Sequence, residues 1–309
     1  MTGRSEHANA SPARPLLLFG GSGQVGRRLR DALASLGTVV APTRAQVDLT
    51  DAEAIRATIA RERPIVVVNS AAMTNVDQAE REPELARAVN ELAPGSMAEA
   101  ARDVGALMVH YSTDYVFDGA ARVPYDENAQ PNPINRYGRS KLAGERRVAD
   151  ADAPHLIIRT SWVYSVTGAG FVASLLRDLP EKTTVRIVAD QVGSPTWSKS
   201  LATATAALVR AAVLDDEVVL NSSDWGVYHL GGSGEGSRVE IAETLIDALG
   251  IRGMTERPTI VPVSASAFGA LAPRPHYSAL SNLRAEKRFG ITLRPWRTDL
   301  RRMVTDEYR

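Results

Sequence analysis

The segment YGRSKLAGE places a tyrosine and a lysine, Tyr137 and Lys141, four residues apart where the pattern predicts a helix. Side chains at this spacing lie on one face of a helix, so both can act on the same molecule. A tyrosine acts as an acid or base near neutral pH when its pKa falls from about 10 to near 7, worth about 4 kcal/mol. A neighbouring ammonium supplies part of that stabilisation. The pair therefore indicates proton-transfer chemistry.

A second polar group, Ser112, Thr113 and Asp114, follows directly where the apolar run ALMVHY ends. In an open parallel sheet, binding sites gather at the carboxyl ends of the strands. We expect these residues to line the site, with Thr113 hydrogen-bonded to a substrate carbonyl beside Tyr137. The alternative is a turn that is merely rich in capping residues.

A glycine loop, GGSGQVG, follows the apolar run LLLF and opens a helical segment, with glycines at positions 20, 23 and 26. Gly20 permits the tight turn, Gly23 lets the backbone approach a pyrophosphate, and Gly26 lets the helix pack closely on the strand. Free N–H groups at the helix start then meet the phosphates. The loop predicts a dinucleotide site.

The segment APTRAQ, after the second predicted strand, bears on the choice of dinucleotide. An acid here would pair with a free ribose 2′-hydroxyl, but the chain has Thr43 and Arg44. A hydroxyl and a cation suit a 2′-phosphate, so we expect NADPH to be favoured, with NADH possible. Asp48 and Leu49 are placed to contact the adenine. The alternative for Arg44 is an exposed loop arginine.

The elements that position these residues alternate between short apolar runs and amphipathic segments, from LLLF to HLIIRTSWVY. This pattern predicts an α/β fold whose doubly wound, Rossmann-like parallel sheet binds NAD(P) and spans 15–165. Glycine and proline punctuation predicts a smaller, mixed C-terminal substrate domain, mainly 166–309. A strand near 227–230 is expected to return to the first sheet, and 1–14 to form a disordered tail.

The composition excludes several function classes. With 36 basic and 36 acidic residues, the chain has no net field for nucleic acid or an anionic membrane, so the expected partner is a small molecule. No cysteine is present, and the five histidines are too scattered for a metal motif. No apolar run approaches the roughly 18 residues of a membrane span, and the start lacks the apolar core of a signal peptide. We expect a cytoplasmic protein.

Together these motifs carry a family resemblance. The segments LLLFGGSGQVG, VVVNSAAMTNVDQAE, VHYSTDYVFDG, NRYGRSKLAGE, LIIRTSWVY, DQVGSPT, GVYHL and RPHYSAL occur in this order. The chain resembles the extended short-chain dehydrogenase/reductases and, more closely, the dTDP-4-dehydrorhamnose reductases, nearly end to end from Leu16. The resemblance implies NADPH-dependent reduction of the 4-keto group of dTDP-4-dehydro-β-L-rhamnose, a dTDP-linked nucleotide sugar, to dTDP-L-rhamnose.

The resemblance also implies roles for individual residues. Tyr137 is the implied proton donor, Lys141 contacts the nicotinamide ribose, and Thr113 tunes the proton transfer. Asp114 and Trp162 are implied to lie near the sugar, with Thr113 and Tyr137. The expected cofactor site, counting Tyr137 and Lys141, also includes Gly20, Gly23, Gln24, Val25, Thr43, Arg44, Asp48, Leu49, Ala71, Ala72, Met73 and Thr74.

One departure from the family pattern concerns assembly. In some family members a metal bridges a dimer through carboxylates, one of them on the first helix, where this chain has Arg27 and Arg28. We therefore expect a monomer or a weak homodimer, and no bound divalent metal.

Three other functions stay open from the sequence. A sugar-nucleotide 4,6-dehydratase would need a carboxylic acid beside Asp114, where Tyr115 stands. A 4-ketoreductase of another nucleotide-linked deoxysugar would fit the same motifs. A non-catalytic regulatory subunit is disfavoured because the expected catalytic residues are all in place.

Overall fold

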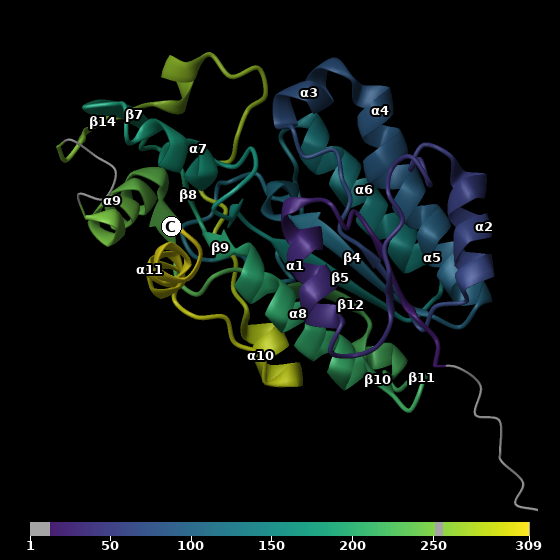
Figure 1. The fold of residues 1–309 in the computed structure, drawn as a ribbon. Helices are drawn as coiled ribbons and strands as arrows, with labels where there is room; N and C mark the ends of the chain where they lie inside the picture. The colour runs from purple at the N-terminus through teal and green to yellow at the C-terminus, as the bar shows by residue number, and fades with distance from the viewer. Residues whose placement is uncertain (1–12, 251–255, 309) are drawn as a thin grey trace, which may run out of the picture.

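The computed structural model describes residues 13–250 and 256–308. The described residues form a six-stranded sheet in the order β12-β5-β4-β3-β1-β2, with every neighbouring pair parallel (Figure 1). The predicted Rossmann-like α/β fold is confirmed. The strands are β1 (Leu16–Phe19), β2 (Val39–Val40), β3 (Val66–Asn69), β4 (Leu107–Thr113), β5 (His155–Thr160) and β12 (Gly226–His229).

Helices cover both faces of the sheet, because strands that are apolar throughout must be buried on both sides. The side chains of Leu16 and Leu18 pack towards α1 (Gln24–Leu33) and α8 (Ser198–Ala212). Those of Leu17 and Phe19 pack in the opposite core, which is closed by α2 (Ala52–Glu62), α5 (Ala93–Asp103) and α6 (Arg136–Asp150).

The amphipathic segment 83–105 does not form one continuous α-helix in the structure. It comprises α4 (Pro83–Arg87), a π-helical turn η1 (Ala88–Leu92) and then α5. A short helix that the sequence pattern did not indicate, α3 (Val76–Arg81), precedes it. Such π turns occur frequently at functional sites, and this one carries a buried asparagine, Asn90, that supports the cleft described below.

A second layer of structure lies beyond the carboxyl edge of the sheet, on the left of Figure 1. Its core is built around two buried tryptophans, Trp197 and Trp296, and includes α7 (Phe171–Asp178), α9 (Arg238–Leu249) and α11 (Trp296–Glu307). The parallel pair β7 (Thr184–Val188) and β14 (Thr259–Val263) lies against α9. Smaller elements are β6 (Val163–Tyr164), β8 (Val192–Gly193), β9 (Thr196–Trp197), β10 (Val213–Leu214), β11 (Glu217–Val218), β13 (Gly236–Ser237) and α10 (Leu283–Phe289).

The chain crosses between the two layers more than once. The helix α8 and the strand β12 both follow residue 165, yet α8 packs with α1 over the sheet and β12 pairs with β5. Arg14 is tied down, since its guanidinium donates to the carbonyls of Pro64 at 2.6 Å and Val104 at 2.7 Å. The rest of the expected tail, 1–12, lies outside the described residues.

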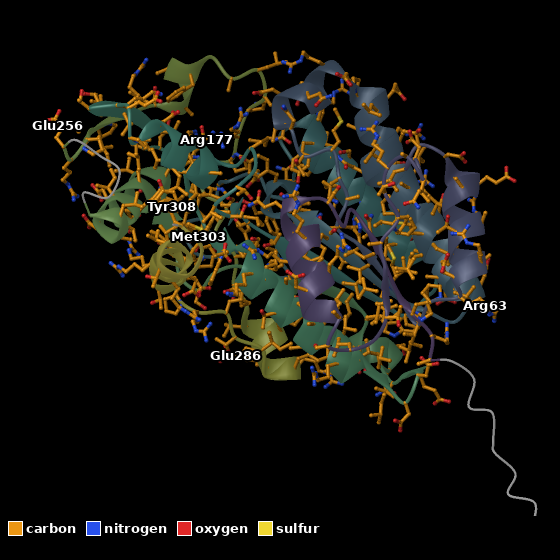
Figure 2. All side chains as sticks on the ribbon, viewed as in Figure 1. Arg63, Arg177, Glu256, Glu286, Met303 and Tyr308 are labelled. Atoms are coloured by element: carbon orange, nitrogen blue, oxygen red, sulfur yellow. The ribbon has the colours of Figure 1, made fainter. Side chains whose placement is uncertain are left out.

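The surface is rich in charged side chains; Figure 2 labels the exposed Arg63 and Arg177 among them. Across 13–250 and 256–308, none of the helices combines the length and the apolar character that crossing a membrane requires.

Candidate active site

A cleft of about 1000 Å³ runs along the carboxyl ends of β1, β3 and β4. It shares a wall with a smaller chamber of about 230 Å³, and Thr74, Thr113, Tyr137, Trp162 and Arg238 line both. The chain passes from β1 to β2 on one side and then returns to β3 on the other. Ligands of doubly wound sheets bind at such a switch point.

The glycine loop has no room for side chains. A Cβ atom on Gly20, whose φ is +84°, would lie 2.6 Å from the Ala71 nitrogen, and one on Gly26 would lie 1.9 Å from the Gly20 carbonyl oxygen. Gly23 is the N-cap of α1, and no side chain caps the first turn. The loop thus leaves the N–H groups of a helix start open towards the cleft, which fits a dinucleotide diphosphate.

Nearly all of the residues expected around the dinucleotide line the cleft. Thr43 is the exception: its N–H and its hydroxyl both donate to the Gln46 side-chain oxygen, at 2.8 and 3.0 Å. The expected contact of this hydroxyl with a 2′-phosphate is therefore not supported. The residues brought to the cleft are Gly20, Gly23, Gln24, Val25, Arg44, Asp48, Leu49, Ala71, Ala72, Met73, Thr74, Tyr137 and Lys141.

Asp48 is exposed, and its carboxylate accepts hydrogen bonds from the backbone N–H and the hydroxyl of Thr50, at 2.9 and 2.8 Å. These two bonds, with a smaller contribution from the charge of Arg44, hold the pKa of Asp48 below its ordinary value. Arg44 therefore lies close enough to Asp48 to interact with it electrostatically on the cofactor side of the cleft.

The backbone of residues 71–74 is held by two asparagines that the sequence analysis did not single out. Asn90 accepts from the Met73 N–H at 2.9 Å and donates to the Met73 carbonyl at 3.1 Å. It also donates to the Ser140 hydroxyl at 3.1 Å, which ties this loop to α6. Asn69 accepts from the Ala71 N–H at 3.1 Å. Asn69 lies within the segment VVVNSAAMTNVDQAE without a role assigned to it, and Asn90 lies in none of the motifs because it acts through contacts distant in sequence.

Tyr137 and Lys141 are both buried on α6 and both line the cleft. The Lys141 ammonium donates to the Tyr111 carbonyl at 2.6 Å and lies 3.4 Å from the Nε2 atom of His110. Burial lowers the pKa of Lys141 to about 8, and the carboxylate of Glu145 opposes that change. Lys141 therefore still carries its charge at neutral pH.

The protonation of Tyr137 differs from the expectation. Burial raises the pKa of Tyr137, hydrogen bonding by Thr113 opposes part of the rise, and the charge of Asp114 adds to it. The expected lowering is not found among the groups of this chain, because the ammonium of Lys141 is directed at a backbone carbonyl. Tyr137 consequently holds its proton at neutral pH, which suits a proton donor.

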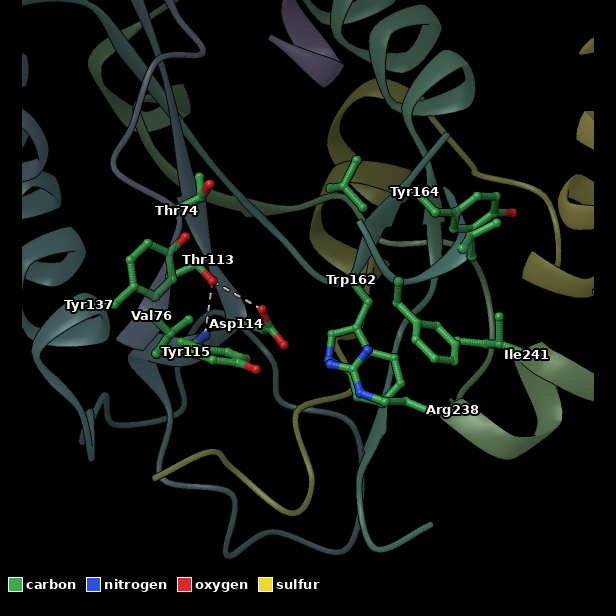
Figure 3. A pocket seen from close by; sticks show the side chains of 13 residues that line it. Thr74, Val76, Thr113, Asp114, Tyr115, Tyr137, Trp162, Tyr164, Arg238 and Ile241 are labelled. Carbon is green, nitrogen blue, oxygen red and sulfur yellow. Dashed lines mark hydrogen bonds between the residues drawn. The ribbon is translucent and has the colours of Figure 1, made fainter. Parts of the chain in front are cut away.

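The polar group Ser112, Thr113 and Asp114 lies at the carboxyl end of β4 and serves more than one purpose. The Thr113 hydroxyl donates to one Asp114 carboxylate oxygen at 3.1 Å (Figure 3). The other oxygen accepts from Ser161 at 2.9 Å and Ser278 at 2.5 Å. Burial raises the pKa of Asp114 to about 6 against these bonds. Thr113 also accepts from the N–H of Tyr115, so it caps a turn and lines the cleft at once.

Ser112 is hydrogen-bonded to a buried ion pair, Glu145–Arg159, beneath the site. Its hydroxyl donates to Glu145 at 2.5 Å, and Arg159 binds both oxygens of the same carboxylate, at 2.9 and 2.6 Å. Glu145 lies on α6 one turn beyond Lys141. This network joins the ends of β4 and β5 to the helix that carries Tyr137.

Trp162 faces these residues from the other side of the chamber (Figure 3). The segment HLIIRTSWVY, predicted as one strand, breaks here into β5 and β6, and Trp162 has a φ of +44°. A Cβ on Gly193 would lie 2.6 Å from the indole, while the guanidinium of Arg238 lies 4.3 Å from the ring centre. Packing on both faces of the ring sustains this uncommon backbone conformation.

The two arginines of α1 that depart from the family pattern both have partners within the chain. Arg28 binds Glu307 of α11 at 2.5 Å, and Arg27 donates to the Ser22 carbonyl at 2.9 Å. Within the described ranges, no three histidine or acidic side chains gather as a metal site would require.

The fold and the site together define a class of protein. A glycine loop at the switch point of a parallel sheet, with a tyrosine and a lysine one helical turn apart in the same cleft, is the arrangement of the short-chain dehydrogenase/reductases, which are NAD(P)-dependent oxidoreductases.

Comparisons with known proteins narrow the class. A family model described as RmlD substrate binding domain matches residues 14–309. The chain is 41% identical to the dTDP-4-dehydrorhamnose reductase of Burkholderia thailandensis, covering 91% of this chain and 95% of that protein. It is 38% identical to that of Salmonella typhimurium, covering 95% and 98%. The dTDP-4-dehydrorhamnose reductase of Bacillus anthracis, solved in complex with NADP, has a TM-score of 0.86 at 32% identity, covering 95% and 99%. The chain belongs to the dTDP-4-dehydrorhamnose reductase family.

Proposed function

We propose that this protein reduces the 4-keto group of dTDP-4-dehydro-β-L-rhamnose with NADPH and releases dTDP-L-rhamnose. The observation that carries the proposal is that Tyr137 and Thr113 share one cleft with the glycine loop in a chain of this family. The NADP complex of the Bacillus anthracis relative supports the choice of cofactor. When bound, the reduced nicotinamide supplies the hydride to C4.

Tyr137 supplies the proton in this proposal. As C4 is reduced, its oxygen gains negative charge and needs a donor placed in advance. Tyr137 is protonated because burial raises its pKa. The Thr113 hydroxyl, which donates to Asp114 in this structure, is proposed to turn and donate to the same oxygen. Lys141, charged at neutral pH, is placed to contact the nicotinamide ribose and fixes the end of β4 through the Tyr111 carbonyl. Asp114 and Trp162 are proposed to hold the sugar.

We also propose a division of labour along the chain. Residues 15–165 serve mainly the cofactor, and residues 166–309 serve mainly the nucleotide sugar. The positions of Arg238 and Arg274 on the cleft wall support this, while α8 is an exception that covers the sheet.

Any self-association is proposed to be weak and independent of divalent metal, because α1 carries Arg27 and Arg28 where a bridging metal would need carboxylates. We expect the elution volume on a sizing column to agree between runs with magnesium and runs with a chelator. A dimer that forms only with magnesium would refute this.

The function is tested directly by product analysis. The protein is incubated with NADPH and a panel of nucleotide-linked 4-keto-6-deoxy sugars, and products are identified by mass and by NMR stereochemistry. The expected product is dTDP-L-rhamnose. Turnover of only a different deoxysugar would assign the chain to another 4-ketoreductase, and no turnover of any panel member would overturn the proposal.

A further inference from the structure

Arg238, the first residue of α9, is a cleft residue that the sequence motifs did not reveal. It lines both the cleft and the chamber. Its guanidinium stacks on Trp162 at 4.3 Å and on Phe171 at 5.2 Å from the ring centres, and its Nε donates to the Gln191 side chain at 3.2 Å. Figure 3 shows it beside Trp162, across the pocket from Tyr137. Three aromatic or amide partners thus fix its orientation.

The charge of this guanidinium is poorly compensated by the chain. Arg274 on the same cleft pairs with Asp77 at 3.1 Å, whereas no carboxylate in the described part of the chain forms an ion pair with Arg238. Burial lowers the pKa of Arg238 and the nearby charge of Arg274 adds to this effect, while Tyr115 and the charge of Asp114 oppose only part of it. A cation at the start of a helix also meets the positive end of the helix dipole. An anionic ligand would relieve all three penalties.

The geometry of a pyranose indicates which anion this is. C1 and C4 lie on opposite sides of the ring, so a sugar whose C4 oxygen meets Tyr137 directs its C1 substituent to the facing wall. Tyr115 lies between Tyr137 and the facing wall. Its ring centre is 5.9 Å from that of Tyr137, and its hydroxyl interacts with Arg238. A planar guanidinium matches phosphate oxygens in a bidentate way.

We propose that Arg238, held in place by Trp162, binds the diphosphate of the nucleotide sugar and so selects nucleoside diphosphate sugars. This inference rests on the proposed function for the orientation of the sugar. The competing interpretation is that Arg238 only supports the strained Trp162 by stacking on it.

Binding of dTDP and of thymidine separates the two interpretations. Both probes are titrated in saturating NADP⁺, which keeps dTDP out of the cofactor site, with wild type, Arg238→Gln, Arg238→Lys and a matched control, Arg186→Gln. Arg186 also stacks on an aromatic ring, that of Phe268 at 5.6 Å, but is exposed and does not line the cleft.

Arg238→Gln is expected to weaken dTDP binding about tenfold to a hundredfold and to leave thymidine binding within about twofold. The KM for the nucleotide sugar rises to the same extent, while kcat changes little. Arg238→Lys keeps part of the dTDP affinity, and Arg186→Gln matches wild type. Raising the salt concentration should weaken dTDP binding to wild type more than to Arg238→Gln.

Equal losses for dTDP and thymidine would show that Arg238 only supports Trp162, and unchanged dTDP binding would refute the diphosphate contact. NADPH affinity and thermal unfolding verify that each variant is folded. If wild type binds dTDP through Arg238 but reduces no 4-keto sugar, the proposed function fails and this inference stands. If it reduces the sugar and Arg238→Gln leaves KM unchanged, the inference alone fails.

Discussion

The two walls of the cleft are built in different ways. The cofactor wall consists largely of backbone from two continuous stretches, 20–25 and 71–74, where glycines and helix N–H groups face the ligand. The opposite wall consists of side chains from segments far apart in sequence, among them Tyr115, Trp162 and Arg238. A diphosphate common to many dinucleotides is well served by backbone, whereas a particular sugar nucleotide needs specific side chains.

The electrostatics of the two walls differ in the same sense. On the cofactor wall, Asp48 is exposed and its pKa is lowered by hydrogen bonds. On the substrate wall, burial dominates and raises the pKa of both Asp114 and Tyr137. Groups perturbed by desolvation in a cleft are typical of sites that do chemistry. We therefore expect the reacting groups to lie on the substrate wall. Mutations on each wall test this expectation.

The largest expected effect comes from Tyr137→Phe. Removing the proposed proton donor should lower kcat by about a hundredfold to ten-thousandfold, because general acid catalysis contributes that much. NADPH affinity, measured by fluorescence titration, should stay nearly unchanged. The control Tyr228→Phe removes a buried hydroxyl bonded to the Asp224 carbonyl, away from the cleft. Wild-type turnover by Tyr137→Phe would remove Tyr137 from the mechanism.

The same contrast explains how much of the molecule could be predicted. The glycine loop and the Tyr137–Lys141 pair were predictable because their geometry follows from short spacings along one strand-helix turn or one helix face. On the substrate wall, Thr113 and Asp114 were predictable from their place at the end of an apolar run, Trp162 was indicated only by the family resemblance, and Arg238 was not predicted. The backbone of Trp162 depends on packing against Gly193 and Arg238, which no local pattern records.

Two further differences between the sequence-based predictions and the structure also arise from packing that no local pattern records. The helix α8 covers the sheet beside α1 because that face needs a second apolar helix, although its sequence position suggested the other domain. The pKa of Tyr137 depends on the depth of its burial and on where the Lys141 ammonium points, and neither follows from a spacing of four residues.

A smaller, pH-dependent effect is expected for Asp114→Asn. Because the folded pKa of Asp114 is raised to about 6, the folded state retains this proton more strongly than the unfolded chain does. The contribution of Asp114 to the free energy of unfolding should therefore fall as pH rises from about 4 to 6. Moving a carboxyl pKa from its ordinary 3.8 to about 6 corresponds to about 3 kcal/mol. Urea unfolding should show Asp114→Asn more stable than wild type by up to this amount at pH 7.5, with no gain at pH 4.

Asp118→Asn is the matched control, and its expected change in stability at pH 7.5 has the opposite sign. Hydrogen bonds led by the Ala120 N–H lower the pKa of Asp118, so its charge stabilises the fold at neutral pH. Replacing it should reduce stability at pH 7.5 and have less effect at pH 4. If Asp114→Asn instead loses stability at neutral pH, the buried carboxylate is better stabilised by Ser161 and Ser278 than its raised pKa indicates.

The smallest effect in this series is expected on the cofactor wall, for Arg44→Ala. Thr43 and Arg44 were both predicted to contact a 2′-phosphate. The Thr43 hydroxyl is bonded to Gln46, so Arg44 is the member of this pair that lines the cleft. A charge-assisted hydrogen bond to an exposed phosphate is worth about 1.5 to 3 kcal/mol, so the KM for NADPH should rise about tenfold to a hundredfold. NADH kinetics should hardly change, since NADH lacks that phosphate.

Arg27→Ala is the control for Arg44→Ala, because Arg27 lies on the same side of the molecule but donates to the Ser22 carbonyl and does not line the cleft. If both arginines acted only through a general positive field, the two variants would lose NADPH affinity alike and salt would mask both losses. A direct contact predicts a loss for Arg44→Ala alone. Equal losses with NADPH and NADH would make Arg44 structural, and a wild-type preference for NADH would show that the cofactor wall does not select the phosphate at all.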